Sequence, residues 1–251
     1  PSILDGREAM KEDAALLHDN LTTREFGEDT GRKSNIANHI QLTKGNLEDG
    51  FANADVIIER EFHTASVHQG YIEPHNSTAL WDPDGHITIW SSTQGAFDIR
   101  SQTAEFLGVG ISAVTVMPVE IGGGFGAKGV TYLAPVSAVL AKKAGRPVKI
   151  AMSRKEVFEG SGPASATFMR VKLGAKKDGK LTAGQAYMVY EAGAFPGAPV
   201  GGGAVTTFGS YNIENMLVDG YDVVCNKQKA QAYRAPGQPQ AAFAVESAMD
   251  E

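Results

Sequence analysis

Cysteine, excess charge and long apolar runs are all scarce in this sequence of 251 residues. Its single cysteine, Cys225, excludes an internal disulfide and is typical of a reducing compartment, so we expect a cytoplasmic location. The formal net charge is −6 and there is no basic tail, which argues against nucleic acid as a partner. No apolar run reaches the length of a membrane span, and the N-terminus does not resemble a signal peptide, so we expect no membrane partner.

Both ends of the sequence lack the signals of natural termini. The chain starts at Pro1 without an initiator Met. It stops at Glu251 directly after an apolar, helix-like run over 241–249 that has no helix stop signal. We therefore expect a domain that belongs to a longer subunit.

The distribution of polar and apolar residues predicts an α+β fold. Residues 1–47 are polar and rich in turn signals, which predicts an extended lead-in, and residues 48–251 form the expected domain. Asp-Gly turns at 82–85 and 177–180 join alternating segments, which predicts antiparallel hairpins packed with a few helices. Strands are predicted at 56–62, 78–81, 86–91, 113–117, 148–152, 168–174, 181–190 and 216–224, and helices at 47–54, 97–107 and 132–144.

A glycine-rich loop, Ile121–Gly129, is predicted between a strand and a helix. Five of its nine residues are glycine, and Phe125 is the single aromatic residue among them. Glycine is used where the backbone takes positive φ or comes very close to another group. Successive N–H groups in such a turn form an anion-binding concavity, so the loop predicts a site for a phosphate or another oxyanion. The alternative is a floppy surface turn.

The string Gly122-x-Gly124-x-x-Ala127 satisfies the dinucleotide fingerprint, so an NADP-binding Rossmann-type dehydrogenase domain is the main alternative. Three observations argue against it. No acidic residue ends the next strand, where Ser153-Arg154 stands and would suit only a 2′-phosphate. The chain continues as antiparallel hairpins, and Phe125 occupies a turn that normally needs a small residue. A P-loop is excluded because Gly129 follows the lysine.

Three histidines, His63, His68 and His75, lie close together in the sequence with Glu73, which raises the question of a metal site. No two of these histidines have the sequence separation that zinc ligands show in helices or tight turns, and no cysteine lies nearby. The sequence therefore predicts no metal-ligand cluster here.

Three motifs in a fixed order carry a resemblance to a known family. They are Ser92-Thr93-Gln94, Ile121–Lys128 and Ala232–Gln240, supported by shorter matches at Leu47–Asp55, His68, Glu73-Pro74 and Glu191–Phe195. Together they resemble the molybdopterin-binding large subunit of the xanthine dehydrogenase and aldehyde oxidase family, the molybdenum hydroxylases. The resemblance covers residues 19–251, and the chain would be the first half of the molybdopterin-binding domain.

The resemblance implies a molybdopterin cofactor, possibly as the cytosine dinucleotide, held by hydrogen bonds from the protein rather than by metal ligands. Gln94 matches the glutamine whose amide approaches an oxo ligand of molybdenum. Phe125 and the backbone of Gly123, Gly124 and Gly126 match the loop beside the metal, and Arg234 matches an arginine that binds phosphate or oxo groups. The implied reaction is hydroxylation of an electron-poor carbon by water. Electrons would leave through 2Fe-2S and FAD groups carried by partner subunits or domains, in an oligomeric enzyme.

Departures from the family pattern narrow this expectation. The family's general-base glutamate is expected beyond Glu251, so no catalytic residue is assigned and the fragment alone is expected to be inactive. Gly129 stands where purine-oxidising members carry a glutamate, which argues against xanthine. Ala235 stands where copper-containing carbon monoxide dehydrogenases carry a cysteine, which argues against carbon monoxide. An aldehyde or an N-heteroaromatic substrate remains.

Each site residue also has a purely structural alternative. Gln94 would cap the helix that follows it, Phe125 would be a core residue, and Arg234 would pair with a carboxylate such as Glu73 or Glu246. A domain that folds without binding any cofactor is the corresponding alternative for the whole chain.

Overall fold

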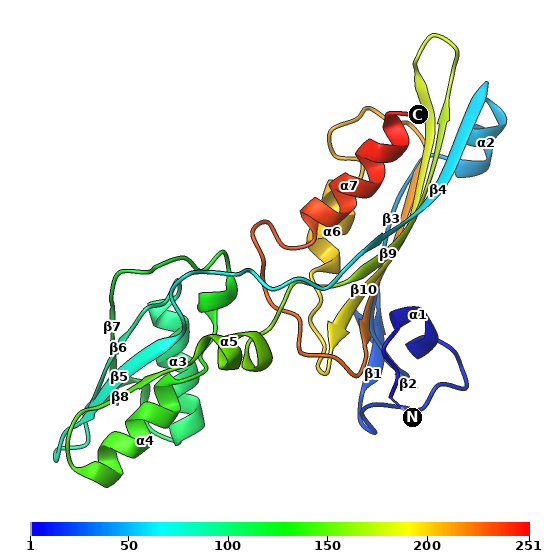
Figure 1. The fold of residues 1–251 in the computed structure, drawn as a ribbon. Helices are drawn as coiled ribbons and strands as arrows, with labels where there is room; N and C mark the ends of the chain where they lie inside the picture. Colours follow the sequence, from blue (N-terminus) through cyan, green and yellow to red (C-terminus); the bar gives the residue numbers. More distant parts are fainter. Residues whose placement is uncertain (1) are drawn as a thin grey trace. The chain divides into compact units, whose positions relative to one another are not determined.

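The computed structural model describes residues 2–251, which form two compact units (Figure 1). Unit 1 combines the chain up to Val67 with Pro163–Glu251, and unit 2 is the inserted segment His68–Gly162. Both units contain a mixed β-sheet with helices, so the predicted α+β fold is confirmed. No helix within residues 2–251 is long and apolar enough to cross a membrane.

Unit 1 is built on a seven-stranded sheet in the order β2-β1-β3-β11-β10-β9-β4. The β9–β10 hairpin has its predicted Asp-Gly turn, in which Gly179 takes a φ of 89°. The pairs β1–β3 and β10–β11 are parallel, and the other neighbours are antiparallel. The strands are β1 (Thr22–Glu25), β2 (Glu28–Lys33), β3 (Ile36–Lys44), β4 (Val56–Thr64), β9 (Thr167–Ala175), β10 (Leu181–Gly193) and β11 (Met216–Val224).

Helices cover both faces of this sheet. The larger core lies under α6 (Val200–Thr206) and α7 (Gln238–Met249), where Met188 and Tyr190 are buried. Successive strand residues point to opposite faces, so Val189 belongs to a second cluster under α1 (Gly6–Ala9), on the side away from α6 and α7 (Figure 1). The short α2 (Leu47–Ala52), capped by the side chain of Asn46, precedes β4 as predicted.

The structure differs from the expected lead-in over residues 22–44, which form β1, β2 and β3. β3 pairs with β11 from Ile36 to Lys44, so this segment belongs to the sheet. Every residue of β2 is exposed, and β1 has only one buried residue. The apolar alternation that identifies a strand in a sequence is therefore missing, because backbone pairing rather than side-chain burial holds these strands. The expected boundary near residue 47 lies inside unit 1.

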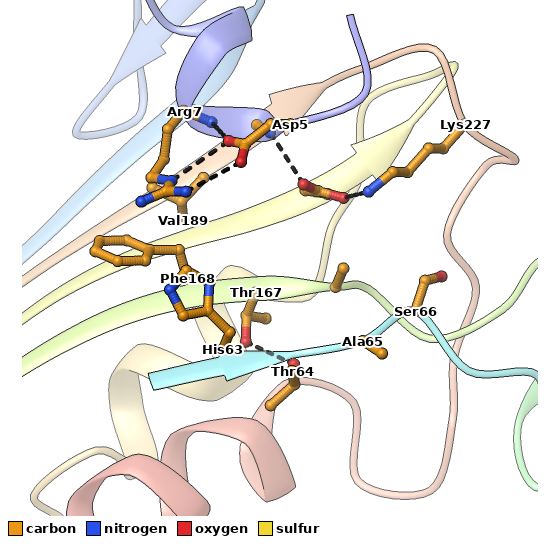
Figure 2. Close-up of a pocket in the computed structure, with 13 residues that line it drawn as sticks. Asp5, Arg7, His63, Thr64, Ala65, Ser66, Thr167, Phe168, Val189 and Lys227 are labelled. Carbon is orange, nitrogen blue, oxygen red and sulfur yellow. Dashed lines mark hydrogen bonds and ion pairs between the residues drawn. The ribbon is translucent and has the colours of Figure 1, made fainter. Parts of the chain in front are cut away.

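The segment before β1 is also docked on unit 1. The N–H of Gly6 donates to Oε1 of Glu191 at 2.9 Å, and the guanidinium of Arg7 lies 4.5 Å from the ring centroid of Phe168. Figure 2 shows Arg7 beside Asp5 at the edge of a hollow of about 300 Å³. The charged side chains lining this hollow pair with one another, Arg7 with Asp5 and Lys227 with Glu191.

Unit 2 has a four-stranded sheet in the order β7-β6-β5-β8, and the predicted hairpin of β5 and β6 lies at its centre. β6 and β7 are parallel neighbours joined through α3, while β8 pairs antiparallel with β5. The elements are β5 (Asn76–Trp81), β6 (Ile87–Ser91), α3 (Ala96–Leu107), β7 (Val114–Pro118), α4 (Ala134–Ala144), β8 (Val148–Ala151) and α5 (Arg154–Gly160), with 3₁₀ turns η1 (Ile111–Ala113) and η2 (Ala127–Gly129).

Three helices, α1, α5 and α6, are absent from the sequence-based assignment. α5 begins with a capping box between Ser153 and Glu156, a local signal that the polar composition of the segment obscured. α6 contains Gly202 and Gly203, which are poor helix formers. A Cβ at Gly203 would lie 2.1 Å from Oη of Tyr190, so the helix can pack this closely only with glycine at that position.

Candidate functional site

Two loops of unit 2 meet at the carboxyl ends of the parallel strands β6 and β7. Ser91 at the end of β6 is in register with Pro118 at the end of β7. The loop after β6 contains Gln94, and the loop after β7 is the glycine-rich segment Ile121–Gly129. In open α/β sheets ligands bind outside the carboxyl ends of parallel strands. This geometry brings two of the three predicted motifs together.

The side chain of Gln94 is bonded directly to the glycine loop. Its Oε1 accepts hydrogen bonds from the N–H of Gly126 at 2.8 Å and of Lys128 at 3.2 Å. In return, the N–H of Gln94 and Oγ1 of Thr93 both donate to the carbonyl of Lys128, at 2.9 and 3.0 Å. A Cβ at Gly124 would lie 2.6 Å from Oε1 of Gln94, so glycine is required for this contact.

These bonds fix the orientation of the Gln94 amide. The atom that accepts from two N–H groups must be the oxygen, so the NH₂ group points away from the loop. Within residues 2–251 this NH₂ group has no hydrogen-bond acceptor, and the residue is exposed. Gln94 does not cap α3, which starts after Gly95 without a side-chain cap. An unpaired donor held in a fixed direction suits a ligand that presents an oxygen.

The loop backbone takes conformations that few residues adopt. Gly123, Phe125 and Gly126 have φ values of 90°, 53° and 106°. A positive φ at a bulky residue is strained and persists only where the surroundings enforce it. Phe125 is 46% exposed, so it is not a core residue. Within residues 2–251 the N–H groups of Gly123, Gly124 and Phe125 have no acceptor, which leaves three consecutive donors available.

Glu73 and Lys128 hold the loop from the interior of unit 2. Nζ of Lys128, whose side chain is fully buried, lies 2.7 Å from Oε2 of Glu73. The same oxygen accepts from the N–H of Gly122 at 2.8 Å, and Asn76 donates to Oε1 at 2.9 Å. Burial alone would raise the pKa of Glu73, but the hydrogen bonds from Lys128, Gly122 and Asn76 outweigh it and lower this pKa. Sequence reasoning missed this pair, which 55 residues separate.

Two of the three histidines singled out in the sequence, His68 and His75, belong to a polar network in unit 2, whereas His63 lies against Phe168 in unit 1. Nδ1 of His68 accepts from the N–H of Gly70, and its Nε2 lies 2.9 Å from Oγ of Ser161. Oη of Tyr71 lies 2.7 Å from Nε2 of His75, and burial with the nearby Lys128 charge lowers the pKa of His75 to about 4. No three His, Cys, Asp or Glu side chains within residues 2–251 could hold a metal ion.

Arg234 lies in unit 1, between β11 and α7. It is exposed and has no ion pair within residues 2–251. Glu73 pairs with Lys128, and Glu246 accepts from Tyr211, so neither carboxylate suggested by the sequence neutralises Arg234. The next residue, Ala235, takes a φ of 56°. Contact of Arg234 with Gln94 and the glycine loop stays a prediction, because they belong to different units.

The topology argues against the dinucleotide alternative. A dinucleotide fold requires the strand after the glycine loop and helix to lie beside the strand before them. Here β7 and β8 occupy opposite edges of the sheet, separated by β6 and β5. Arg154, the residue suited to a 2′-phosphate, donates instead to the carbonyl of Ile72.

A family model for the molybdopterin cofactor-binding domain matches residues 29–251. The chain belongs to this family, within the molybdenum hydroxylases. The resemblance drawn from the three motifs is therefore confirmed. The chain is a molybdopterin-binding domain of the xanthine dehydrogenase and aldehyde oxidase type.

Individual relatives are similar across most of the chain. A probable hypoxanthine oxidase of Escherichia coli (strain K12) is 31% identical over 274 residues, which cover 97% of this chain and 28% of that protein. The nicotinate dehydrogenase large molybdopterin subunit of Eubacterium barkeri is 29% identical, with 96% and 55% covered. The structure of aldehyde oxidoreductase from Desulfovibrio gigas superposes with a TM-score of 0.85 at 27% identity, covering 98% of this chain and 26% of that one. The chain thus spans between about a quarter and about half of the length of these relatives.

Proposed function

We propose that this domain binds molybdopterin in an oxidoreductase that hydroxylates an aldehyde or N-heteroaromatic carbon with water. The observation that carries the proposal is the set of unpaired donors at the carboxyl ends of β6 and β7. The NH₂ of Gln94 and three consecutive loop N–H groups have no acceptor within residues 2–251. A molybdopterin presents oxo and phosphate oxygens, which are hydrogen-bond acceptors, so this donor set fits the group.

The cofactor-binding residues that we propose are Gln94, Gly123, Gly124, Phe125 and Gly126 in unit 2, together with Arg234 in unit 1. When bound, the cofactor would supply the two-electron chemistry of the hydroxylation. Gln94 would donate from an amide that its two loop hydrogen bonds hold in place. The loop N–H groups would stabilise negative charge on cofactor oxygens without moving, which is the main advantage of preorganised donors.

Arg234 would complete the site from unit 1. Its guanidinium offers a planar fork of donors that matches phosphate or oxo oxygens in two directions at once. Because no carboxylate within residues 2–251 neutralises it, its positive charge remains available to an anionic group. The general base is not among these residues, and we propose that it lies in the part of the subunit that follows Glu251.

The relatives support the substrate classes. The names of two of them specify an N-heteroaromatic compound, nicotinate, and an aldehyde. We propose that electrons pass to iron–sulfur and flavin partners, and that the pterin carries a cytosine nucleotide. Gly129 and Ala235 continue to argue against xanthine and carbon monoxide.

The test is a substitution that removes only the donor of Gln94. In the complete subunit with its partners, Gln94→Glu keeps an oxygen for Gly126 and Lys128 but has no NH₂ group. We expect molybdenum and pterin contents to fall at least tenfold, measured by metal analysis and by pterin fluorescence after denaturation. The control is Gln102→Glu, since Gln102 also accepts a backbone N–H in unit 2, that of Thr131 at 3.2 Å, but lies outside the loop.

The same preparation tests the alternatives. Absence of molybdenum and pterin from the wild-type complete enzyme would refute the proposal. Saturable binding of NADP would revive the dinucleotide alternative. Equal cofactor contents in the two Gln→Glu variants would remove Gln94 from the site.

A further inference from the structure

The glycine loop contains a buried positive charge, that of Lys128, which packing of the loop alone would not require. The side chain of Lys128 is fully buried, with Nζ 5.1 Å from the ring centroid of Tyr71. Removing an ammonium from water is unfavourable unless a partner compensates it closely. Glu73 is that partner, and it comes from the segment before β5 rather than from the loop. A structure that only needed a well-packed loop would use an apolar side chain here.

The Glu73–Lys128 pair connects two parts of the glycine loop. One carboxylate oxygen of Glu73 accepts both from the N–H of Gly122 at 2.8 Å and from Nζ of Lys128 at 2.7 Å. The N–H of Glu73 also donates to the carbonyl of Gly122 at 3.0 Å. The first and last parts of the loop are therefore tied to a single residue outside it.

This external tie leaves the middle of the loop unbonded. A loop of this kind usually satisfies its amides internally or with water. Here Glu73 fixes one end and Gln94 fixes the other, through the N–H groups of Gly126 and Lys128. The N–H groups of Gly123, Gly124 and Phe125 are consequently held in position without being used. The strained φ of Phe125 persists because both flanks are fixed.

We propose that the Glu73–Lys128 ion pair is a positioning pair that holds the amides of Gly123–Phe125 toward the cofactor. This inference rests on the proposed role of the loop in cofactor binding. Neither side chain touches the cofactor in this arrangement; both act through the backbone of the loop. The competing view is that the pair contributes only to the stability of unit 2.

The two views predict different results for a double variant. Glu73→Gln leaves a buried ammonium unpaired, and Lys128→Met leaves the carboxylate without its cation, so each single variant lowers the stability of unit 2. The combination removes both charges and restores stability, because paired removal of a buried ion pair is often neutral. It does not restore the tie, since methionine has no donor. The double variant is therefore the only one in which we expect the loop to lose its position while unit 2 keeps its stability.

Hydrogen exchange measures the positioning. In the intact chain, amide exchange at Gly126 and Lys128, which donate to Gln94, is compared with exchange in β5 and β6 of the same unit. We expect these two amides to exchange about tenfold to a hundredfold faster in the single variants and in the double variant, beyond any change in β5 and β6. Asn76→Ala, which removes the bond to the other carboxylate oxygen, is the milder variant if a single variant fails to fold.

The matched control is Glu156→Gln. It removes one carboxylate of unit 2 from the capping box of α5, so it lowers stability without touching the loop. Exchange at Gly126 and Lys128 should then change only in parallel with β5 and β6. The same parallel behaviour in the Glu73 and Lys128 variants, or full recovery in the double variant, would overturn the positioning role.

Cofactor content completes the test in the complete subunit with its partners. We expect the double variant to lose at least tenfold in molybdenum and pterin content, although its unit 2 is as stable as in the wild type. Wild-type content in the double variant would overturn the link between loop positioning and the cofactor. If the wild type itself carries no molybdenum or pterin, the proposed function fails, and the exchange data alone decide whether the pair positions the loop.

Discussion

The two units bury different chemistry. In unit 1 the sheet and the helices α6 and α7 enclose an apolar cluster that includes Met169, Met188 and Val245. In unit 2 the region beside the glycine loop contains the buried ammonium of Lys128, the buried imidazole of His75 and the part-buried carboxylate of Glu73. An apolar core tolerates changes of pH, whereas a buried polar network loses stability when one member gains a proton or is removed. The stability of unit 2, which holds the proposed binding loop, is therefore expected to depend more strongly on pH than that of unit 1.

The sequence supplies a separate reporter for each unit. Its only two tryptophans, Trp81 and Trp90, lie in β5 and β6 of unit 2. Its only cysteine, Cys225, is fully buried in unit 1. Tryptophan fluorescence therefore follows unit 2, and the rate of thiol labelling follows the opening of unit 1, in the same unmodified chain.

The largest effect is expected from a cavity in unit 1. Met188→Ala removes a side chain that is 1% exposed, which should lower the free energy of unfolding by about 2–5 kcal/mol. Thiol labelling of Cys225 should accelerate accordingly. Val205→Ala is the control in the same unit, because Val205, in α6, is 68% exposed. An equal loss of stability in both variants would show that the apolar cluster is not the main source of stability in unit 1.

A comparable effect is expected in unit 2 on acidification. The pKa of His75 is about 4 in the folded chain, against 6.5 for a free histidine. Between these values the unfolded chain binds the additional proton, so stability falls as the pH drops from 6.5 to 4, by about 3 kcal/mol in total. Denaturant titrations followed by tryptophan fluorescence should show this slope.

The histidine origin of that slope can be checked directly. His75→Gln keeps an acceptor for Tyr71 but does not titrate, so the slope between pH 6.5 and 4 should flatten. Hydrogen bonds lower the pKa of Glu73, so its contribution to stability is lost as the pH falls through the acidic range in which the unfolded carboxyl, and then the folded one, takes up a proton. An unchanged slope in His75→Gln would assign the acid sensitivity to another group.

A smaller, local effect is expected in the glycine loop. Gly124→Ala places a Cβ 2.6 Å from Oε1 of Gln94, so the amide must move, at a cost of about 1–3 kcal/mol. Exchange at Gly126 and Lys128 should increase. Gly129→Ala is the control, since a Cβ there has no neighbour within 4 Å. Similar exchange in both variants would contradict the close packing of Gln94 on the loop.

The smallest effect is expected at the docked N-terminal segment. Arg7→Ala removes a surface ion pair with Asp5 and the contact with Phe168, which together contribute about 1 kcal/mol or less. Labelling of Cys225 should change less than fivefold. A loss as large as that of Met188→Ala would mean that α1 is an integral part of the core of unit 1.

The sequence was sufficient for elements with strong local signals. The Asp-Gly turn between β5 and β6 and the end of α3 at Leu107, before Gly108 with its φ of 64°, are both local and were predicted correctly. The strands β1 and β2 were missed because they bury almost no side chains and are held by backbone pairing with each other and with β3, which alone of the three pairs with a distant strand, β11. The site likewise combines features with local sequence signals and contacts between segments that are distant in the sequence. The glycine loop is visible in the sequence. Its bonds to Gln94 and to Glu73 depend instead on the parallel register of β6 and β7 and on a part-buried contact across 55 residues.

The insertion of unit 2 has a consequence for the order of folding. β4, which leads out of unit 1, pairs with β9, which leads back, and the N–H of Ala164 donates to the carbonyl of Val67 at 2.8 Å. Closing so long a loop adds little cost in equilibrium stability, since each doubling of length costs only about 0.6 kcal/mol. The insertion has a larger effect on the order in which the strands become available for pairing. During synthesis β3 and β4 emerge before β11 and β9, the strands that pair with them. We expect unit 2 to fold during synthesis while unit 1 still lacks three of the seven strands of its sheet.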